Sequence, residues 1–384
     1  MEIQKLKDIC LTEITDGTHQ TPTYSEYGYI FLSSKNVTTQ KIDWDNVMFI
    51  PEKLHEELYK RVAPQIDDIL LAKNGTTGVA AIVDRDIVFD IYVSLALIRP
   101  NTEIVMPRYL LYAINNPVVK GYFDSSLKGI GVPNLHLKNI RETPIKIYDL
   151  ETQKAIVEKL DKVCELISLR KQQLEKLDEL VKERFVEMFG DINVSNKKWM
   201  TYPLGELCTI VRGGSPRPIE RYLGGTIPWI KIGDATTGEN IYLNSTKEHI
   251  IQEGVKKSRM IKAGSLIFAN CGVSLGFARI ITFDGCIHDG WLAMEDIDEK
   301  IDKIFLLYSL NQMTEYFRKT APAGTQPNLN TNIMKMHRQI VPPMEMQKAF
   351  ISFVKCADRQ KQIVQQSLDK LELMKKALMQ EYFG

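Results

Sequence analysis

Two carboxylates and a lysine within seven residues are the side chains most suggestive of catalysis. Asp67-Asp68 and Lys73 are of the types that nucleases use to bind a metal ion and to polarise a phosphate group. A later segment of similar pattern has Gly264-Ser265 and Asn270 in their places, with neither carboxylates nor lysine. A duplicated enzyme can lose one of two sites, so this comparison weighs against catalysis without excluding it.

Other catalytic and cofactor motifs are incomplete. Asn115-Asn116-Pro117 begins like the Asn-Pro-Pro-aromatic motif of amino-methyltransferases, but the second proline and the aromatic residue are missing. No Gly-x-x-x-x-Gly-Lys-Ser/Thr phosphate loop is present. The glycine-rich segments at residues 74–78 and 271–276 lack the Gly-x-Gly-x-x-Gly pattern, so they predict tight turns. We therefore expect a non-catalytic chain with no cofactor of its own.

Composition narrows the class of protein further. The chain has 384 residues, 44% hydrophobic and 25% charged, which excludes collagen, low-complexity disorder and a disulfide-rich scaffold. Its six cysteines are scattered, which predicts reduced thiols, no metal site and a cytoplasmic location. No apolar run approaches the ~20 residues of a membrane span, and the N-terminus lacks a signal-peptide pattern. A net charge of +1 argues, at first, against nucleic acid.

The chain is an internal duplication. Pro133-Asn134-Leu135 recurs as Pro327-Asn328-Leu329, and Gln153-Lys154-Ala155 recurs as Gln347-Lys348-Ala349, both at a separation of 194 residues. Without gaps, residues 133–190 and 327–384 are identical at 15 of 58 positions. Each half is thus a variable module of about 150 residues followed by a better-matched segment of about 40 residues. We call residues 1–150 module 1 and residues 191–344 module 2.

The matched segments, residues 151–190 and 345–384, are predicted to be long helices. Apolar residues follow alternating steps of four and three over about four heptads in each, a coiled-coil pattern. If the two helices pair within the chain they must run antiparallel, with the modules related by an approximate twofold axis; alternatively, each helix packs only on its own module. Polar residues interrupt the seam at Arg170, Arg184, Lys361 and Lys375. The apolar seam comprises Ile156, Leu160, Val163, Ile167, Leu174, Leu177 and Val181, and then Phe350, Val354, Val364, Leu368, Leu371 and Leu378.

The modules have strand-like runs with short helices, which predicts small α+β domains with a twisted sheet. Module 1 has such runs at residues 29–32, 68–72, 79–83 and 92–98, followed by a helix at residues 107–115. Module 2 parallels them at residues 227–230, 265–269, 277–282 and 291–294, with a helix near residues 303–312.

These features together resemble the specificity subunits of type I restriction-modification systems, over essentially the whole chain. The most specific segments are residues 131–135 and 324–329, each ahead of a long helix, with Asp16–Pro22 and Gly213–Pro216 near the starts of the modules. Each motif alone is weak, but their repeated order within a half-length duplication is specific.

The resemblance implies two target recognition domains, each of which reads one half of a bipartite site in double-stranded DNA. It also implies that the paired helices separate these domains and dock methyltransferase subunits, two in number, with restriction subunits completing the complex. S-adenosylmethionine, ATP and magnesium would then belong to the partner subunits. A helix of about 57 Å corresponds to roughly 17 base pairs, so two half-sites more than one turn apart are within reach. A stand-alone methyltransferase or nuclease, and a coiled-coil protein adaptor, are the alternatives.

Charge is unevenly divided between the halves, at −4 for residues 1–190 and +5 for residues 191–384. Arginine suits bidentate contacts with guanine and lysine suits phosphates, so basic clusters and turn residues are the DNA-binding candidates. Because module 1 offers few phosphate contacts, we expect the isolated chain to bind DNA weakly. The candidates are Thr18, His19, Lys73, Asn74, Thr76 and Thr77 in module 1, and Arg212, Arg217, Arg221, Lys256, Lys257, Arg259, Asn270 and Ser274 in module 2.

Overall fold

The chain divides into two compact units, each of which combines one module with parts of both long helices. The computed structural model describes residues 1–127, 134–191, 199–236, 241–272, 274–321 and 328–384. Unit 1 comprises residues 1–171 and 366–384, and unit 2 comprises residues 172–365. The repeated motif segments 131–133 and 324–327 lie outside the described residues.

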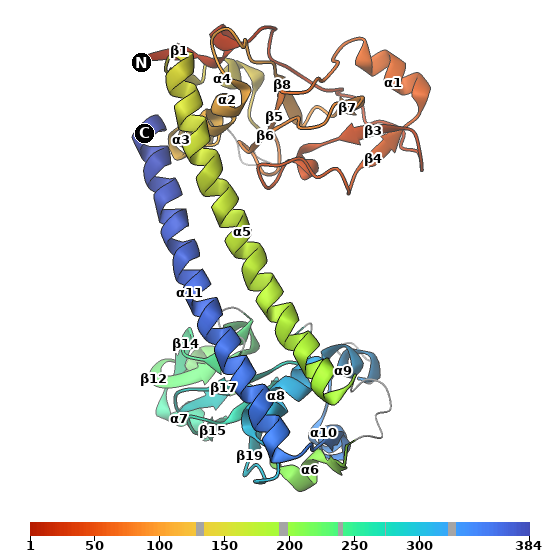
Figure 1. The fold of residues 1–384 in the computed structure, drawn as a ribbon, viewed down its shortest axis with the longest axis vertical. Helices are drawn as coiled ribbons and strands as arrows, with labels where there is room; N and C mark the ends of the chain where they lie inside the picture. The colour runs from red at the N-terminus through yellow and green to blue at the C-terminus, as the bar shows by residue number, and fades with distance from the viewer. Residues whose placement is uncertain (128–133, 192–198, 237–240, 273, 322–327) are drawn as a thin grey trace. The chain divides into compact units, whose positions relative to one another are not determined.

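The described residues of unit 1 form three small sheets, parts of which are labelled in Figure 1. A four-stranded antiparallel sheet has the order β2-β8-β5-β6, a three-stranded sheet has the order β4-β3-β7, and β1 pairs with β9. The strands are β1 (Glu2–Lys5), β2 (Thr15–Asp16), β3 (Tyr29–Leu32), β4 (Met48–Ile50), β5 (Ile69–Ala72), β6 (Ala80–Ile82), β7 (Phe89–Ile91), β8 (Leu95–Ile98) and β9 (Pro144–Ile147), and the helices are α1 (Glu52–Tyr59), α2 (Pro107–Ile114), α3 (Pro117–Ser126) and α4 (Leu137–Arg141).

Strand β5 is buried on both faces and separates two hydrophobic cores. Ile69 and Leu71 belong to the core under α2 and the long helices, whereas Leu70 and Ala72 belong to the core beneath the three-stranded sheet. Successive side chains of a strand point to opposite faces, so an uninterrupted apolar run is required at this position. The sequence run at residues 68–72 therefore marks the centre of the module.

Unit 2 repeats this plan with longer sheets. A five-stranded sheet has the order β11-β19-β16-β17-β13, a four-stranded sheet has the order β14-β12-β18-β15, and β10 pairs with β20. The strands are β10 (Thr201–Pro203), β11 (Thr209–Arg212), β12 (Leu223–Ile230), β13 (Tyr242–Leu243), β14 (Glu248–Ile250), β15 (Arg259–Ile261), β16 (Leu266–Ala269), β17 (Ala278–Ile281), β18 (Gly285–Ile287), β19 (Trp291–Glu295) and β20 (Arg338–Ile340), and the helices are α6 (Leu204–Leu207), α7 (Gln252–Val255), α8 (Lys303–Gln312), α9 (Thr314–Thr320) and α10 (Thr331–Met336).

Strand β16 has the same central role in unit 2. Leu266 and Phe268 join the core beneath α8 and the long helices, whereas Ile267 and Ala269 join the core on the opposite face. The duplication inferred from the sequence is therefore also a duplication of the two-core architecture.

The long helices are α5 (Leu150–Phe189) and α11 (Met344–Phe383), each of 40 residues. Near the start of each lies the repeated glutamine, which is fully buried. Gln153 accepts a hydrogen bond from the amide of Met106 (2.9 Å) and donates to the carbonyls of Ile104 (2.9 Å) and Tyr148 (2.7 Å). Gln347 makes the equivalent bonds in unit 2, with the amide of Asp302 and the carbonyls of Lys300 and Pro342. The repeated motif thus anchors each helix to its own module.

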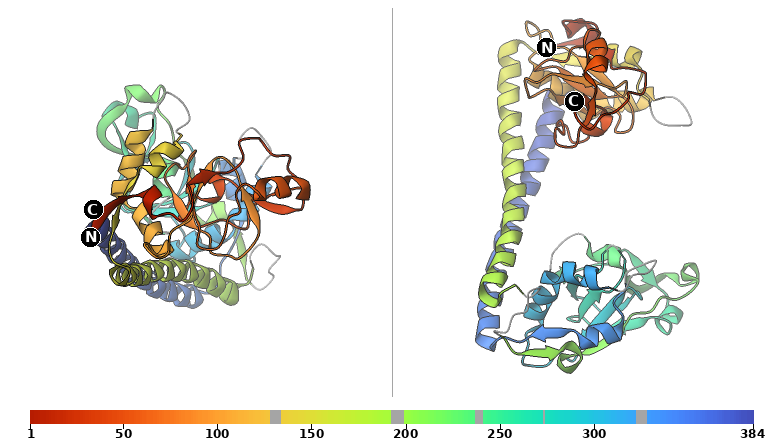
Figure 2. Two further views of the ribbon diagram at one scale, coloured as in Figure 1. Left: turned by 90° about the horizontal axis from the view of Figure 1, so that it is seen from above. Right: turned by 90° about the vertical axis from the view of Figure 1, so that its right-hand side faces the viewer.

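The two helices pair in antiparallel orientation within each unit. In unit 1, Lys159 Nζ lies 3.2 Å from the hydroxyl of Tyr382, and Arg170 Nε donates to Ser367 Oγ at 3.2 Å. As residue numbers rise along α5, those of the contacts on α11 fall. In unit 2, Lys361 forms an ion pair with Asp178. Figures 1 and 2 show the start of α5 and the end of α11 side by side on one flank of module 1.

The end of each long helix completes the core of the module that it reaches. Phe383 of α11 is buried in the core of module 1, where its ring lies 5.3 Å from that of Tyr109. Its repeat partner Phe189 of α5 is buried in module 2, with ring centroids 5.0 Å from Phe305 and 5.6 Å from Phe350. Each module is therefore closed by the helix that follows the other module.

The expected seam lies on the inward faces of both helices. All thirteen seam residues are buried or half-buried, with Ile167, Leu174, Leu177, Leu371 and Leu378 the less covered ones. The polar seam residues are half-buried as well, and Arg184 lies over the ring of Phe353 at 5.8 Å. The helices pack on each other and on the modules, so both packing modes expected from the sequence contribute.

The buried glutamines generate a stability prediction. Gln153→Ala leaves the amide of Met106 and two buried carbonyls without partners, so unit 1 should lose about 3 kcal/mol of unfolding free energy. Lys154→Ala, at the exposed neighbouring position, should change it by less than about 0.5 kcal/mol. Hydrogen exchange of the β5 and β16 amides measures units 1 and 2 separately. A loss of equal size in both units after Gln153→Ala would contradict this local role.

Candidate nucleic-acid interface

In module 1, a buried carboxylate contacts a lysine, an arginine and a histidine side chain. Asp16, at the end of β2, forms an ion pair with Lys73, which follows β5. Arg61 Nη2 lies 3.5 Å from Asp16 Oδ1, and His19 Nε2 lies 3.2 Å from the same oxygen. Lys73 and Asp16 are buried, whereas the Arg61 and His19 side chains are 50% and 67% exposed. Asp16 therefore orients the exposed Arg61 and His19 side chains at the surface of the module.

In module 2, an aspartate in the turn between β18 and β19 has the corresponding role. Asp289 accepts a hydrogen bond from Ser215 Oγ (2.8 Å), and its carboxylate lies 3.7 Å from Arg217 Nη2. Its main-chain carbonyl accepts a bond from Arg212 Nε at 2.9 Å. Because the Arg217 side chain is 83% exposed, this cluster presents a guanidinium group to solvent.

Two further side chains join this cluster. Arg259 Nε donates to the main-chain carbonyl of Arg212 at 2.9 Å, which brings the two arginines together. His288 Nε2 lies 3.0 Å from Asp289 Oδ1, but burial lowers the pKa of this imidazole. The positive charge of the cluster near neutral pH therefore comes from its arginines, which suit phosphates and guanine edges.

Corresponding positions in the two modules carry different chemistry. Thr15 pairs with Leu97 of β8 and Val211 pairs with Ala293 of β19, which places Asp16 and Arg212 at equivalent positions, one strand removed from the central strand. After the central strand, Lys73 in module 1 corresponds to Asn270 in module 2. The shared backbone thus carries an acid and a lysine in one module, and an arginine and an asparagine in the other.

The described Asn-Leu part of the repeated motif packs against the turn after the central strand. The amide of Leu135 donates to the carbonyl of Lys73 at 2.9 Å, and the amide of Leu329 donates to that of Asn270 at 2.8 Å. In module 2, Asn270 Nδ2 also donates to Asn328 Oδ1 at 3.2 Å. The repeated Asn-Leu residues therefore hold these turns in position.

The structure divides the predicted binding residues by exposure. Thr18, Thr77 and Asn270 are buried, and Lys73 is buried with its charge neutralised by Asp16. Their polar groups serve turns and internal pairs, so the structure does not present them at the surface, and their role as DNA contacts stays a prediction. Asn74 and Ser274 are half-buried, and the exposed candidates are His19, Thr76, Arg212, Arg217, Arg221, Lys256, Lys257 and Arg259.

The exposed candidates of module 2 are partly brought together. Arg212 and Arg217 contact Asp289, and Arg259 contacts the main-chain carbonyl of Arg212. Lys257 Nζ lies 2.6 Å from the hydroxyl of Tyr222, the residue that follows Arg221. Sequence reasoning missed the carboxylates Asp16 and Asp289, and also Arg61. Asp16 begins the segment Asp16–Pro22 noted above, so a signal was present there; none marked Asp289.

The nuclease-like set of module 1 does not assemble. Asp68 forms two hydrogen bonds with Arg99, of 2.8 and 2.7 Å, and Lys73 is paired with Asp16. Asn115, from the methyltransferase-like motif, binds the backbone of Ala80. These polar residues therefore have structural roles. Within the described ranges, no three His, Cys, Asp or Glu side chains are grouped to hold a metal ion, and no helix there is long and apolar enough to cross a bilayer.

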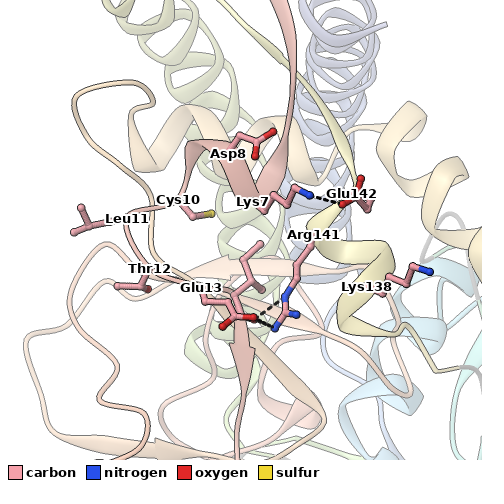
Figure 3. Close-up of a pocket in the computed structure, with 10 residues that line it drawn as sticks. Lys7, Asp8, Cys10, Leu11, Thr12, Glu13, Lys138, Arg141 and Glu142 are labelled. Atoms are coloured by element: carbon pink, nitrogen blue, oxygen red, sulfur yellow. Dashed lines mark hydrogen bonds and ion pairs between the residues drawn. The ribbon is translucent and has the colours of Figure 1, made fainter.

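A recess of about 600 Å³ in unit 1 has its charges neutralised internally. Figure 3 shows Lys7 directed at Glu142 and Arg141 directed at Glu13, with distances of 2.6 and 2.8 Å. Lys138 points away from these pairs (Figure 3). Paired cations have little charge left for phosphate, so we do not place the nucleic-acid interface here.

Comparison with known proteins supports the duplication and its class. The sequence matches the family described as the type I restriction modification DNA specificity domain twice, over residues 1–179 and 196–373. The chain is 24% identical to a putative type I restriction enzyme MjaX specificity subunit of Methanocaldococcus jannaschii, over 98% of this chain and 91% of that protein. The MjaVIII specificity subunit of the same organism is 23% identical, over 83% and 79%.

Two solved structures share the fold. A chain from a study of complex assembly and conformational transition in the type I R-M system matches with a TM-score of 0.64 and 18% identity, over 100% of this chain and 97% of that one. The S subunit of a type I restriction-modification system from M. genitalium matches with a TM-score of 0.57 and 14% identity, over 100% and 96%.

The Asp16–Lys73 pair generates a prediction that separates its structural role from the exposed cations. Asp16→Asn leaves the Lys73 ammonium buried without a counter-charge, so unit 1 should lose about 3–5 kcal/mol. Adding Lys73→Met should recover most of the loss, because the unpaired charge is then absent. Arg61→Ala, at the exposed side of the same carboxylate, should cost less than about 1 kcal/mol. Hydrogen exchange of β5 amides measures all three; no recovery in the double variant would refute the pairing argument.

Proposed function

The chain belongs to the type I restriction-modification DNA specificity domain family, and from this premise we propose that it is the subunit that reads a bipartite, asymmetric DNA sequence for a type I restriction-modification complex. The observation that carries this proposal is the duplicated module whose equivalent positions hold different side chains. Asp16 and Lys73 in module 1 stand where module 2 has Arg212 and Asn270. A shared fold with different surface side chains in its two copies suits the recognition of two different half-sites.

Arginines around Asp289 are the groups best suited to base contacts in module 2. Each arginine that binds a guanine in bidentate fashion contributes about 1–3 kcal/mol of discrimination against other bases. Asp289 restrains Arg217 and Arg212 before DNA arrives, which lowers the entropy lost on binding. In module 1, Asp16 restrains His19 and Arg61 in the same way.

The chain itself is the non-catalytic specificity subunit in this proposal. S-adenosylmethionine, ATP and magnesium would be bound by partner methyltransferase and restriction subunits, in the cytoplasm where the host DNA is. The engagement of Asp68 with Arg99 and of Lys73 with Asp16 argues against the alternative of a stand-alone nuclease. The near-neutral total charge fits a reader that needs its partners to hold the duplex.

Exposed apolar residues on the long helices offer two equivalent docking positions for methyltransferase subunits. In unit 1, the Lys171–Glu372 ion pair (3.1 Å) joins the helices, and Leu169 and Met374 lie two residues beyond it on either helix. They are 49% and 50% exposed. Their repeat partners in unit 2 are Ile363 and Leu180, which are also exposed. The same apolar pair therefore occurs once in each unit, which suits two copies of one partner.

The function is tested by mapping methylated adenines in host DNA. Deleting the chain should remove methylation at one bipartite motif. Arg217→Ala should relax base preference in only one half of that motif, by about 1–3 kcal/mol at one position. Arg338→Ala, an exposed arginine on the separate β10–β20 sheet, should leave the motif unchanged. Unchanged methylation after deletion would reject the proposal, and altered preference in both halves after Arg217→Ala would reject separate reading by the modules.

The docking positions are tested by the stoichiometry of the complex with the methyltransferase subunit. Aspartate at both Leu169 and Met374 should reduce binding from two subunits to one, because a charge on a desolvated apolar contact is strongly unfavourable. Adding Leu180→Asp and Ile363→Asp should abolish binding. Leu166→Asp is the control, since Leu166 is exposed but its repeat partner is Gln360. Equal loss of binding with the control would contradict this assignment; light scattering of the purified complexes gives the numbers.

A further inference from the structure

Unit 2 contains a cavity of about 300 Å³ where module 2 meets both long helices. Its lining includes Asp178 and Lys182 of α5, Lys361 of α11, Tyr308 and Asn311 of α8, and Arg279 of β17. This volume is at the small end of the range for ligand sites in proteins. The cavity lies outside the Asp289 cluster, and none of its residues belongs to the candidate DNA contacts.

Arg279 is a partly buried cation without an acidic partner. Its Nη1 donates to the carbonyl of Ala278 at 2.8 Å, and its guanidinium lies 4.9 Å from the ring centroid of Phe277. Its Nε is buried with no hydrogen-bond partner. Among the described residues, no carboxylate oxygen lies within 4 Å of its guanidinium nitrogens. Burial lowers the pKa of this guanidinium, yet arginine stays protonated in proteins. An uncompensated buried charge is costly unless an anion accompanies it.

Tyr308 adds a second unsatisfied group beside Arg279. The residue is 9% exposed, and its hydroxyl is buried without a partner. Burial, and then the charges of Asp358 and Asp178, raise the pKa of Tyr308, so the hydroxyl remains a donor. Lys361 is paired with Asp178 and lies 3.8 Å from Asp358, while Lys182 is exposed at the edge. Three cations against two carboxylates leave one excess positive charge around the cavity.

Module 1 shows that the fold does not need these groups. Asn115 and Asn311 bind equivalent backbone positions, at Ala80 and Ala278, which aligns the two regions. On that alignment Ala81 stands where module 2 has Arg279. Tyr112 stands where module 2 has Tyr308, and its hydroxyl donates to Asp161. The tyrosine is therefore satisfied internally in module 1, and it lacks a partner only where the arginine is present.

We propose that this cavity binds a small tetrahedral oxyanion, phosphate or sulfate, through Arg279 and the Tyr308 hydroxyl. The anion supplies the counter-charge that Arg279 lacks and an acceptor for Tyr308. An ion of five heavy atoms fits within a cavity of this size. Since α5, α11 and β17 all line it, the bound ion links module 2 to the helix pair within unit 2.

The test is thermal unfolding of the full chain in inorganic phosphate, in sulfate and in sodium chloride at equal ionic strength. The unit 2 transition should rise with phosphate or sulfate concentration beyond its value in chloride, because a ligand of the folded state stabilises it. Arg279→Met should weaken the apparent affinity about tenfold or more, and Tyr308→Phe several-fold. Tyr112→Phe is the matched control and should leave the response unchanged. A response to only one of the two oxyanions identifies which one the site selects.

Arg279→Met carries a second readout that needs no ligand. If the guanidinium lacks a partner in the empty cavity, the variant should unfold at a temperature equal to or above that of the wild type in chloride. A lower temperature in chloride would show that Arg279 is already satisfied and would overturn the proposal. An equal response of all variants to phosphate would show a general salt effect and would overturn it too.

Discussion

The structure depends on the burial of one aromatic residue at the end of each long helix. Phe383 fills the core of module 1 beside Tyr109, and Phe189 fills that of module 2 between Phe305 and Phe350. Removal of a buried phenylalanine side chain from a core costs about 3–5 kcal/mol, a large share of the stability of a domain. Neither module is a closed domain by itself, since part of its core is supplied from a distant part of the chain. The antiparallel pairing of α5 and α11 follows from this exchange.

Much of this fold was predictable from local patterns and from the repeat. The run at residues 68–72 and its counterpart at residues 265–269 predicted strands, and the four-three spacing predicted α5 and α11. The repeat also singled out Gln153 and the Pro-Asn-Leu motif from the sequence alone. The repeat did not predict what these residues bind. Their partners are backbone amides and carbonyls, which cannot be recognised from the sequence.

The binding residues were less predictable because charges that meet in space are far apart in the chain. Lys73 lies in a polar turn after a strand, where a DNA contact is expected. However, it is buried in an ion pair with Asp16, which lies 57 residues earlier in the chain. Asp289 is separated from Ser215 by 74 residues and carries no local motif. In both modules, what the sequence patterns did not identify was an aspartate that positions basic side chains. Composition counts such acids against nucleic-acid binding, whereas here they orient exposed basic side chains.

Each module is closed by the long helix that follows the other module. This arrangement also constrains how such a protein changes its specificity over evolutionary time. A recombination event that replaces the coding region of module 1 must bring in a pocket that accepts Phe383, together with a residue such as Lys146 whose ammonium group binds the carbonyl of Gly384. Asp16 contacts Lys73, Arg61 and His19, and none of these belongs to the core that holds Phe383. On the proposed function, these side chains can therefore diverge without changing that pocket. The matched helix segments give homologous sequence in which crossovers preserve the pocket. A new half-site is therefore acquired by exchange of a whole reader more readily than by gradual change across its core.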